Sequence, residues 1–210
     1  MDPEEKYLRA HSTAQSEALS WLERQTHIRT NFPQMLSGPV QGRFLTMMAE
    51  FCHARSVLEI GTFTGYSAIC LAGGLPEDGH LDALEINDEL EDLIREGFER
   101  AGVAGRIDLH IGDALETLKT LGGRVYDLVY IDADKREYCA YYEAVMPLLR
   151  SGGCILADDV LWGGKLYGDA LPADRQSRGV AAFNDMVAAD PRVEVTILPI
   201  RDGLSIIRKK

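Results

Sequence analysis

Short apolar runs alternate with longer segments of helical periodicity through most of the chain. The apolar runs, which we predict to be strands, cover residues 56–60, 81–86, 107–111, 128–131 and 154–157. The predicted helices between them cover 64–74, 89–101, 114–121 and 137–149. This alternation indicates an α/β fold, a doubly wound and mostly parallel sheet with helices on both faces. The near-continuous apolar strands suit a sheet that is buried on both sides.

The C-terminal part departs from this alternation. Residues 193–200 and 204–207 are two β-rich runs joined by Arg201-Asp202-Gly203. Asp-Gly between apolar runs favours a hairpin, so the sheet is predicted to end with an antiparallel strand. Pro199 cannot donate a hydrogen bond to a neighbouring strand, which places its strand at the sheet edge.

The rest of the chain adds two helices and one long loop. Residues 7–30 and 40–53 have helical patterns. The sheet and its helices are then expected over 54–210, in a single domain spanning 1–210. The irregular stretch 162–178 after the fifth strand is long enough to shape a site.

Composition narrows the function classes. The 210 residues include 22 basic and 33 acidic side chains, a formal net charge of −11. Broad binding to nucleic-acid phosphates needs clustered Lys and Arg, so this charge argues against it. There is no run long enough for a membrane span, no secretory signal, and no C-x-x-C pair among the four cysteines. These features predict a cytoplasmic protein with reduced thiols.

A glycine loop after the first strand carries the strongest signal. The strand ends at Glu59-Ile60, and Gly61 and Gly65 flank a turn that leads into a helix through Ser67. A dinucleotide site, as in a nicotinamide-dependent oxidoreductase, typically has the motif G-x-G-x-x-G, which lets the pyrophosphate bind at the helix N-terminus. Here the spacing is G-x-x-x-G, and Glu59 would repel a pyrophosphate. The alternative ligand is S-adenosylmethionine, which carries an ammonium and a sulfonium and no phosphate.

The next two strand ends fit the same ligand. Glu85 ends the second strand, where a carboxylate can accept hydrogen bonds from both ribose hydroxyls. Asp113-Ala114 follows the third strand and is placed to meet an adenine ring and its exocyclic amine. Ligands of open parallel sheets bind outside these carboxyl ends, which supports a nucleoside site here.

Carboxylates crowd the ends of the fourth and fifth strands. Asp132, Asp134 and Lys135 follow one strand, and Asp158-Asp159 ends the other. Like charges in one site are relieved by a hard divalent cation, and all-oxygen ligands favour Mg, Mn or Ca over Zn. Such an ion could chelate a substrate with two adjacent hydroxyls, with Lys135 taking the proton. The acids could instead cap helices, pair with Lys135 or face water.

Four motifs together resemble the cation-dependent, class I S-adenosylmethionine O-methyltransferases of the catechol and caffeoyl-coenzyme A type, including their small bacterial members. The motifs are Leu58-Glu59-Ile60-Gly61-Thr62-Phe63-Thr64-Gly65-Tyr66-Ser67, Tyr130-Ile131-Asp132-Ala133-Asp134-Lys135, Ala157-Asp158-Asp159-Val160-Leu161-Trp162-Gly163-Gly164, and Leu198-Pro199-Ile200-Arg201-Asp202-Gly203-Leu204. The resemblance runs from about Ser37 to the C-terminus.

The resemblance implies a Rossmann-like core over 54–210, a homodimer and a small phenolic substrate with vicinal hydroxyls. It also implies that the helices within the first 53 residues, together with the loop 162–178, cover the substrate. It implies that Asp132 and Lys135 are catalytic and that the site binds a divalent cation, with Mg as the first choice and Mn or Ca as alternatives. The implied donor-binding residues are Ser37, Glu59, Gly61, Thr62, Gly65, Ser67, Glu85, Asp113, Ala114 and Asp132. The implied metal ligands are Asp132, Asp158 and Asp159.

Two positions depart from the family pattern. Asp159 stands where the family usually has Asn, and Gly163 replaces an Asn that contacts substrate in the plant enzymes. The second departure weighs against a caffeoyl-coenzyme A substrate. Two alternatives to O-methylation of a catechol-like phenol stay open. One is methylation of a hydroxylated tRNA base, and the other is a protein that binds S-adenosylmethionine without catalysis.

Overall fold

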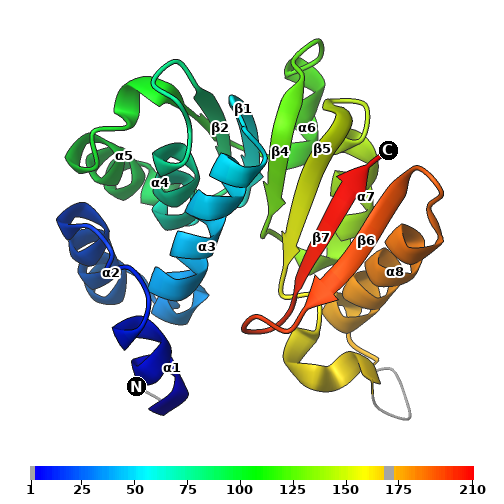
Figure 1. Ribbon diagram of the computed structural model, residues 1–210, viewed down its shortest axis with the longest axis horizontal. Helices are drawn as coiled ribbons and strands as arrows, with labels where there is room; N and C mark the ends of the chain where they lie inside the picture. Colours follow the sequence, from blue (N-terminus) through cyan, green and yellow to red (C-terminus); the bar gives the residue numbers. More distant parts are fainter. Residues whose placement is uncertain (1–2, 168–172) are drawn as a thin grey trace.

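A computed structural model describes residues 3–167 and 173–210, and its centre is a seven-stranded sheet (Figure 1). The strand order is β3-β2-β1-β4-β5-β7-β6. The strands are β1 (Ser56–Ile60), β2 (His80–Glu85), β3 (Ile107–Ile111), β4 (Tyr126–Ile131), β5 (Leu149–Asp158), β6 (Val193–Leu198) and β7 (Leu204–Lys209). The first five strands are parallel, and β7 is antiparallel to both neighbours. The predicted mixed sheet is confirmed.

Helices pack on both faces of the sheet, as the apolar strands require. The α-helices are α1 (Pro3–Ala10), α2 (Glu17–Arg29), α3 (Gly38–Phe51), α4 (Tyr66–Gly73), α5 (Glu91–Arg100), α6 (Ala114–Thr120), α7 (Tyr138–Val145) and α8 (Arg175–Ala189). The short 3₁₀ helices are η1 (Pro33–Met35), η2 (Asp88–Leu90), η3 (Ala104–Arg106), η4 (Lys135–Glu137) and η5 (Trp162–Tyr167). One core layer lies under α2 to α5 and the other under α6 to α8.

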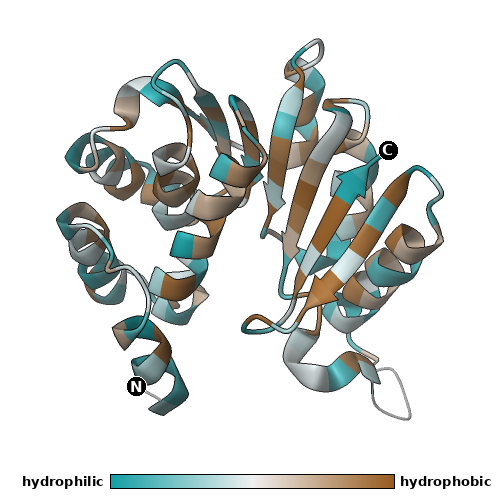
Figure 2. Ribbon diagram, in the orientation of Figure 1, coloured by the Kyte–Doolittle hydropathy of each residue, from teal (hydrophilic) through white to brown (hydrophobic). Residues whose placement is uncertain are grey.

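Period-two alternation along the strands assigns each side chain to one of these layers. In β1, Val57 packs in the layer under α2 to α5, whereas Leu58 packs in the opposite layer. Figure 2 shows the matching mixture of hydrophobic and hydrophilic positions along the strands and helices. The same alternation sends Glu59 toward α4, and it sends Asp158, two residues after Leu156, toward α3.

Most predicted elements are found, with two differences. The single helix predicted over 7–30 is wrong, because Ser16 caps a new helix by accepting a hydrogen bond from the Leu19 amide at 3.3 Å. The fifth strand begins at Leu149, five residues earlier than predicted, because Leu149 already pairs with Tyr126. As predicted, the hairpin at 201–203 joins the last two strands and β6 lies at the sheet edge.

Three further features concern the cysteines, the lengths of the helices and the long loop after β5. All four cysteines are free thiols. The described helices include none that combines the length and apolar character needed to cross a membrane. Residues 168–172 of the predicted site-shaping loop 162–178 lie outside the described residues, and the remainder forms η5 and the start of α8.

Candidate active site

A cavity of about 1060 Å³ opens beyond the carboxyl ends of the parallel strands, where β1 separates β2 from β4. The strand order reverses at this point, which is where open α/β sheets bind ligands. The predicted site residues that line the cavity are Ser37, Gly61, Thr62, Ser67, Glu85, Asp113, Ala114, Asp132, Lys135 and Asp159. Glu59, Gly65 and Asp158 are predicted site residues that do not line it.

The glycine loop brings the ends of β1 and β4 into close contact. Gly61 has φ +87°, and a Cβ atom built on it would lie 2.4 Å from the carbonyl oxygen of Asp132. The Asp132 amide donates to the Ile60 carbonyl at 2.9 Å across the same gap. A side chain at Gly61 would therefore push apart the donor and acidic sides of the cavity.

Gly65 has a packing role. It has φ +88°, and a Cβ atom there would lie 2.8 Å from the Phe98 ring. The residue precedes α4 and lets α5 pack against the turn. Its predicted contact with a donor stays a prediction, because its neighbours are buried side chains and it does not reach the cavity wall.

Glu59 is fully buried, and it forms no ion pair with a Lys or Arg of residues 3–167 and 173–210. Thr62 Oγ1 donates to Glu59 Oε2 at 2.5 Å, and Glu59 Oε1 has no partner among the described residues. Burial raises the pKa of Glu59 to about 8, against hydrogen bonds from Ser67 and Thr62, and the Asp132 and Glu85 charges add to the rise. The carboxyl is therefore mainly neutral at pH 7, and its contact with a donor ammonium stays a prediction.

Glu85 is held at the cavity wall by backbone amides. Its Oε2 accepts from the Phe63 amide at 2.7 Å and its Oε1 from the Asn87 amide at 2.9 Å. Burial raises its pKa, and these amide hydrogen bonds oppose the rise. The carboxyl is thus fixed in orientation at the end of β2, where it can accept hydrogen bonds from a sugar.

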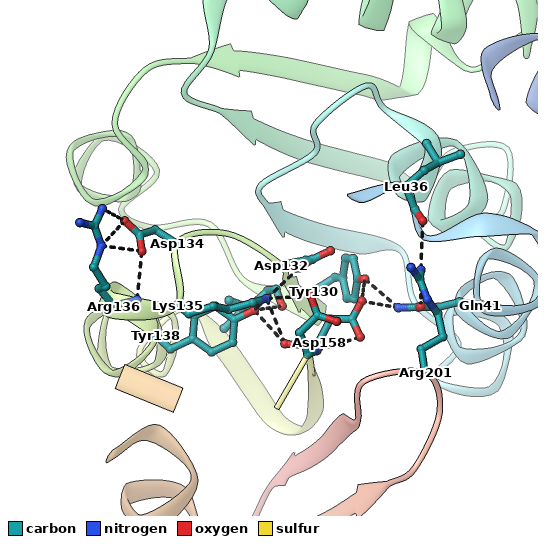
Figure 3. Close-up of polar contacts among 12 residues, drawn as sticks. Leu36, Gln41, Tyr130, Asp132, Asp134, Lys135, Arg136, Tyr138, Asp158 and Arg201 are labelled. Atoms are coloured by element: carbon teal, nitrogen blue, oxygen red, sulfur yellow. Dashed lines mark hydrogen bonds and ion pairs between the residues drawn. The ribbon is translucent and has the colours of Figure 1, made fainter. Parts of the chain in front are cut away.

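Lys135 joins the acidic residues at the ends of β4 and β5 (Figure 3). Its Nζ donates to Asp132 Oδ1 at 2.9 Å, lies 3.5 Å from Asp159 Oδ2, and donates to Tyr138 Oη at 2.5 Å. Burial by itself would lower the pKa of this ammonium. The charges of Asp132, Tyr138 and Asp159 outweigh burial and hold the pKa well above its ordinary value.

Asp158 points to the other side of β5, toward α3. Its Oδ2 accepts from Gln41 Nε2 at 2.5 Å and from Tyr130 Oη at 2.9 Å, and its Oδ1 accepts from the Asp159 amide at 3.0 Å. Burial, followed by the charges of Asp132 and Asp159, raises the pKa of Asp158 to about 7. Figure 3 shows Gln41 between Asp158 and Arg201.

The donor set fits a hard cation, because carboxylate oxygens of Asp132 and Asp159 lie at the cavity wall and both face the single ammonium of Lys135. Asp158 would join them only by turning from Gln41 and Tyr130. The predicted set of three aspartates therefore stays a prediction.

A different group in the described chain has metal-ligand spacing. His80, Asp82 and Asp108 offer ligand atoms that all lie within 4.8 Å of one another. This group lies at the amino ends of β2 and β3, far along the strands from the cavity. Arg124 Nη1 donates to both Asp82 oxygens, at 2.6 and 2.5 Å, and so already supplies a cation there.

Comparison with known proteins identifies the family. A profile described as O-methyltransferase matches residues 9–210. Caffeoyl-CoA O-methyltransferase 1 from Arabidopsis thaliana is 36% identical over 188 residues, covering 83% of this chain and 71% of the plant protein. The chain belongs to the O-methyltransferase family. The resemblance found in the sequence motifs is thereby confirmed.

Solved structures of O-methyltransferases share the whole fold. TomG from Streptomyces achromogenes, in complex with SAM, has a TM-score of 0.92 and 31% identity, with both chains fully covered. The O-methyltransferase from Bacillus cereus, in complex with SAH, has a TM-score of 0.91 and 31% identity, covering 98% of this chain and 96% of that one. The Rossmann-like methyltransferase fold is therefore confirmed.

Two residues that support this O-methyltransferase site, Gln41 and Arg201, were not among the predicted site residues. Gln41 is a polar side chain on the buried side of α3, which is the sequence signal that could have found it. Arg201 Nη1 donates to the Gln41 side chain at 3.1 Å and to the Leu36 carbonyl at 3.0 Å, and so anchors the segment before Ser37. Nothing local in the hairpin sequence indicates this contact, because it joins residues about 160 apart.

Proposed function

We propose that this O-methyltransferase transfers a methyl group from S-adenosylmethionine to one hydroxyl of a small catechol-like phenol with the help of a divalent cation. The observation that carries the proposal is one cavity with two chemically different walls. The walls are the glycine loop with Glu85 on one side and the Asp132, Lys135 and Asp159 cluster on the other.

The donor wall suits a cationic nucleoside. Glu85 presents a fixed carboxylate to the sugar, and Asp113-Ala114 begins α6 beside the expected position of the base. Gly61 lines the cavity, and its lack of a side chain lets the donor wall lie directly against the Asp132 backbone. The SAM and SAH in the structures of TomG and the Bacillus cereus enzyme support this assignment of the donor.

The acidic wall suits the acceptor. Asp132 and Asp159, with Asp158 after a side-chain rotation, are the residues that would hold the cation, for which Mg is the first choice. A bound divalent ion would polarise a chelated diol oxygen and offset the carboxylate charges around Lys135. The acidic lining and the net charge of −11 favour a small phenol over a tRNA base.

Lys135 is assigned as the general base. Its Nζ is 2.9 Å from Asp132 and is the basic nitrogen among the cavity's acidic side chains. The sulfonium S–CH₃ bond breaks as the O–CH₃ bond forms, S-adenosylhomocysteine leaves, and the hydroxyl proton goes to the neutral form of Lys135. The hydrogen bond that Lys135 Nζ donates to Tyr138 Oη, at 2.5 Å, fixes the position of the amine.

The test is methyl transfer from labelled S-adenosylmethionine to a vicinal diphenol, with its monomethyl ether as the matched control acceptor. We expect transfer to the diol, little transfer to the ether, and loss of transfer when a chelator is added. Transfer that is insensitive to the chelator, or equal for the diol and the ether, would refute the cation mechanism.

A further inference from the structure

We propose that the acidic lining of this cavity selects neutral and amine-bearing diphenols and discriminates against anionic acceptors, coenzyme A thioesters included. The inference rests on the proposed function and adds a substrate class to it. It concerns the charge carried by the part of the acceptor that is not methylated.

The cavity wall carries an excess of negative charge. Its acidic side chains are Glu85, Asp113, Glu116, Asp132, Asp134, Glu137 and Asp159. Its basic side chains are Lys135 and Arg136. Seven potential anions against two cations leave a formal excess of five negative charges. A singly charged donor and a divalent cation together would still leave an excess of two.

Both cationic side chains of the wall already form ion pairs with neighbouring carboxylates. Lys135 pairs with Asp132 and Asp159 as described above. Arg136 Nε lies 2.9 Å from both carboxylate oxygens of Asp134. An acceptor carboxylate or phosphate would therefore have to break an existing ion pair before it gained a cation of this wall.

Four other cations near the wall do not line the cavity. Lys165 Nζ lies over the Trp162 ring at 5.7 Å from its centroid, and Arg201 donates hydrogen bonds to carbonyls of the segment before α3. Arg175 and Arg178 lie on α8 within two residues of the lining residue Gln176. The described residues thus present no uncommitted cation inside the cavity to an anionic acceptor.

Glu137 is the wall residue whose charge can be changed with the least effect on other contacts. It lies at the end of η4, is exposed, and makes no ion pair among the described residues. Its side chain makes no capping hydrogen bond to α7 either. Replacing it changes the potential of the cavity without breaking a contact that the fold depends on.

The experiment compares three diphenols of similar size. They are 4-ethylcatechol, which is neutral, 4-(2-aminoethyl)catechol, which is cationic, and 3-(3,4-dihydroxyphenyl)propanoate, which is anionic. We expect kcat/KM for the anionic diol to be at least about tenfold below that for the cationic diol at about 20 mM salt. The ratio should shrink severalfold at about 500 mM salt, because screening weakens the interaction. Caffeoyl-coenzyme A should be a poorer acceptor than methyl caffeate.

Variants at one position connect the selection to the wall. Glu137→Gln should raise the anionic-to-cationic ratio of kcat/KM by about threefold, and Glu137→Lys by about tenfold. Glu99→Gln removes an exposed acid of α5 that does not line the cavity, and it should leave the ratio unchanged. Both Glu137 substitutions leave the cation and donor residues intact.

The possible outcomes distinguish a failure of this inference from a failure of the proposed methyl transfer. Equal kcat/KM for the three diols, or a ratio insensitive to Glu137→Lys, overturns the charge selection and leaves methyl transfer standing. Preference for the anionic diol overturns it as well. Failure to methylate any of the diols overturns the proposed function and this inference with it.

Discussion

Replacing Glu59 with glutamine isolates the effect of a buried acid that pairs with no cation in the described part of the chain. Glutamine has nearly the shape of a protonated glutamic acid, and its carbonyl can accept the Thr62 hydroxyl hydrogen bond now made to Oε2. The substitution therefore removes the titration of the side chain while keeping its packing. The relevant quantity is the free energy of unfolding of the donor-free protein as a function of pH.

The direction follows from the raised pKa of Glu59, which moves from 4.5 to about 8 on folding. Between these values the unfolded chain has lost a proton that the folded protein keeps, so the stability of the wild type falls as pH rises. This contribution amounts to about 2.5 kcal/mol between pH ~5.5 and ~7.5, and Glu59→Gln lacks it. The variant should thus gain stability relative to the wild type by about that amount over this range.

Urea denaturation of both proteins at several pH values measures this difference. All other titrating groups contribute equally to the two proteins, so the pH dependence of the difference reports on Glu59 alone. Glu99→Gln, at an exposed site on α5, serves as the control and should follow the wild type throughout. Parallel curves for the wild type and Glu59→Gln would show that Glu59 is ionised in the folded protein, and the reasoning from burial would fail.

Three further substitutions test the two walls of the site and the buried contact behind them. Gly61→Ala places a Cβ atom 2.4 Å from the Asp132 carbonyl oxygen, and it should cost about 2–4 kcal/mol in a urea titration and weaken S-adenosylhomocysteine binding more than about tenfold by calorimetry. Gln41→Leu removes a hydrogen bond to Asp158 and should cost about 1–3 kcal/mol, and unchanged stability would show that the contact is not formed. Lys135→Met should slow methyl transfer about 10²–10⁴-fold in a single-turnover assay while donor affinity changes little. Equal loss of donor affinity would instead make Lys135 a binding residue.

The architecture was predictable because it follows from repeating patterns. Apolar strands buried on both faces, helical segments between them and a terminal Asp-Gly hairpin each leave a periodic or local signal. The break between α1 and α2 was missed because Ser16 acts as a cap in a stretch whose periodicity continues. The early start of β5 was missed because its pairing with β4 is set by tertiary contact.

The site was predictable where a residue ends a strand. Glu85, Asp113 and Asp132 reach the cavity because the carboxyl ends of parallel strands meet at one edge. The direction in which a side chain leaves the strand is a separate matter. Glu59 and Asp158 point into the layer under the helices, where their partners are Thr62 and Gln41. Period-two alternation along β1 and β5 gives these directions, whereas the motif spacing that selected the two residues does not.

The proposed mechanism requires the cation, the diol and the donor to meet in one cavity, between its donor wall and its acidic wall. Relaxation of the ring protons of a catechol by Mn²⁺, measured by NMR in the presence of S-adenosylhomocysteine, tests it most directly. We predict strong relaxation enhancement with the wild type and its loss in Asp132→Asn and Asp159→Asn. Undiminished enhancement in both variants, or Mn²⁺ binding that leaves the catechol protons unaffected, would contradict the proposed cation-assisted mechanism.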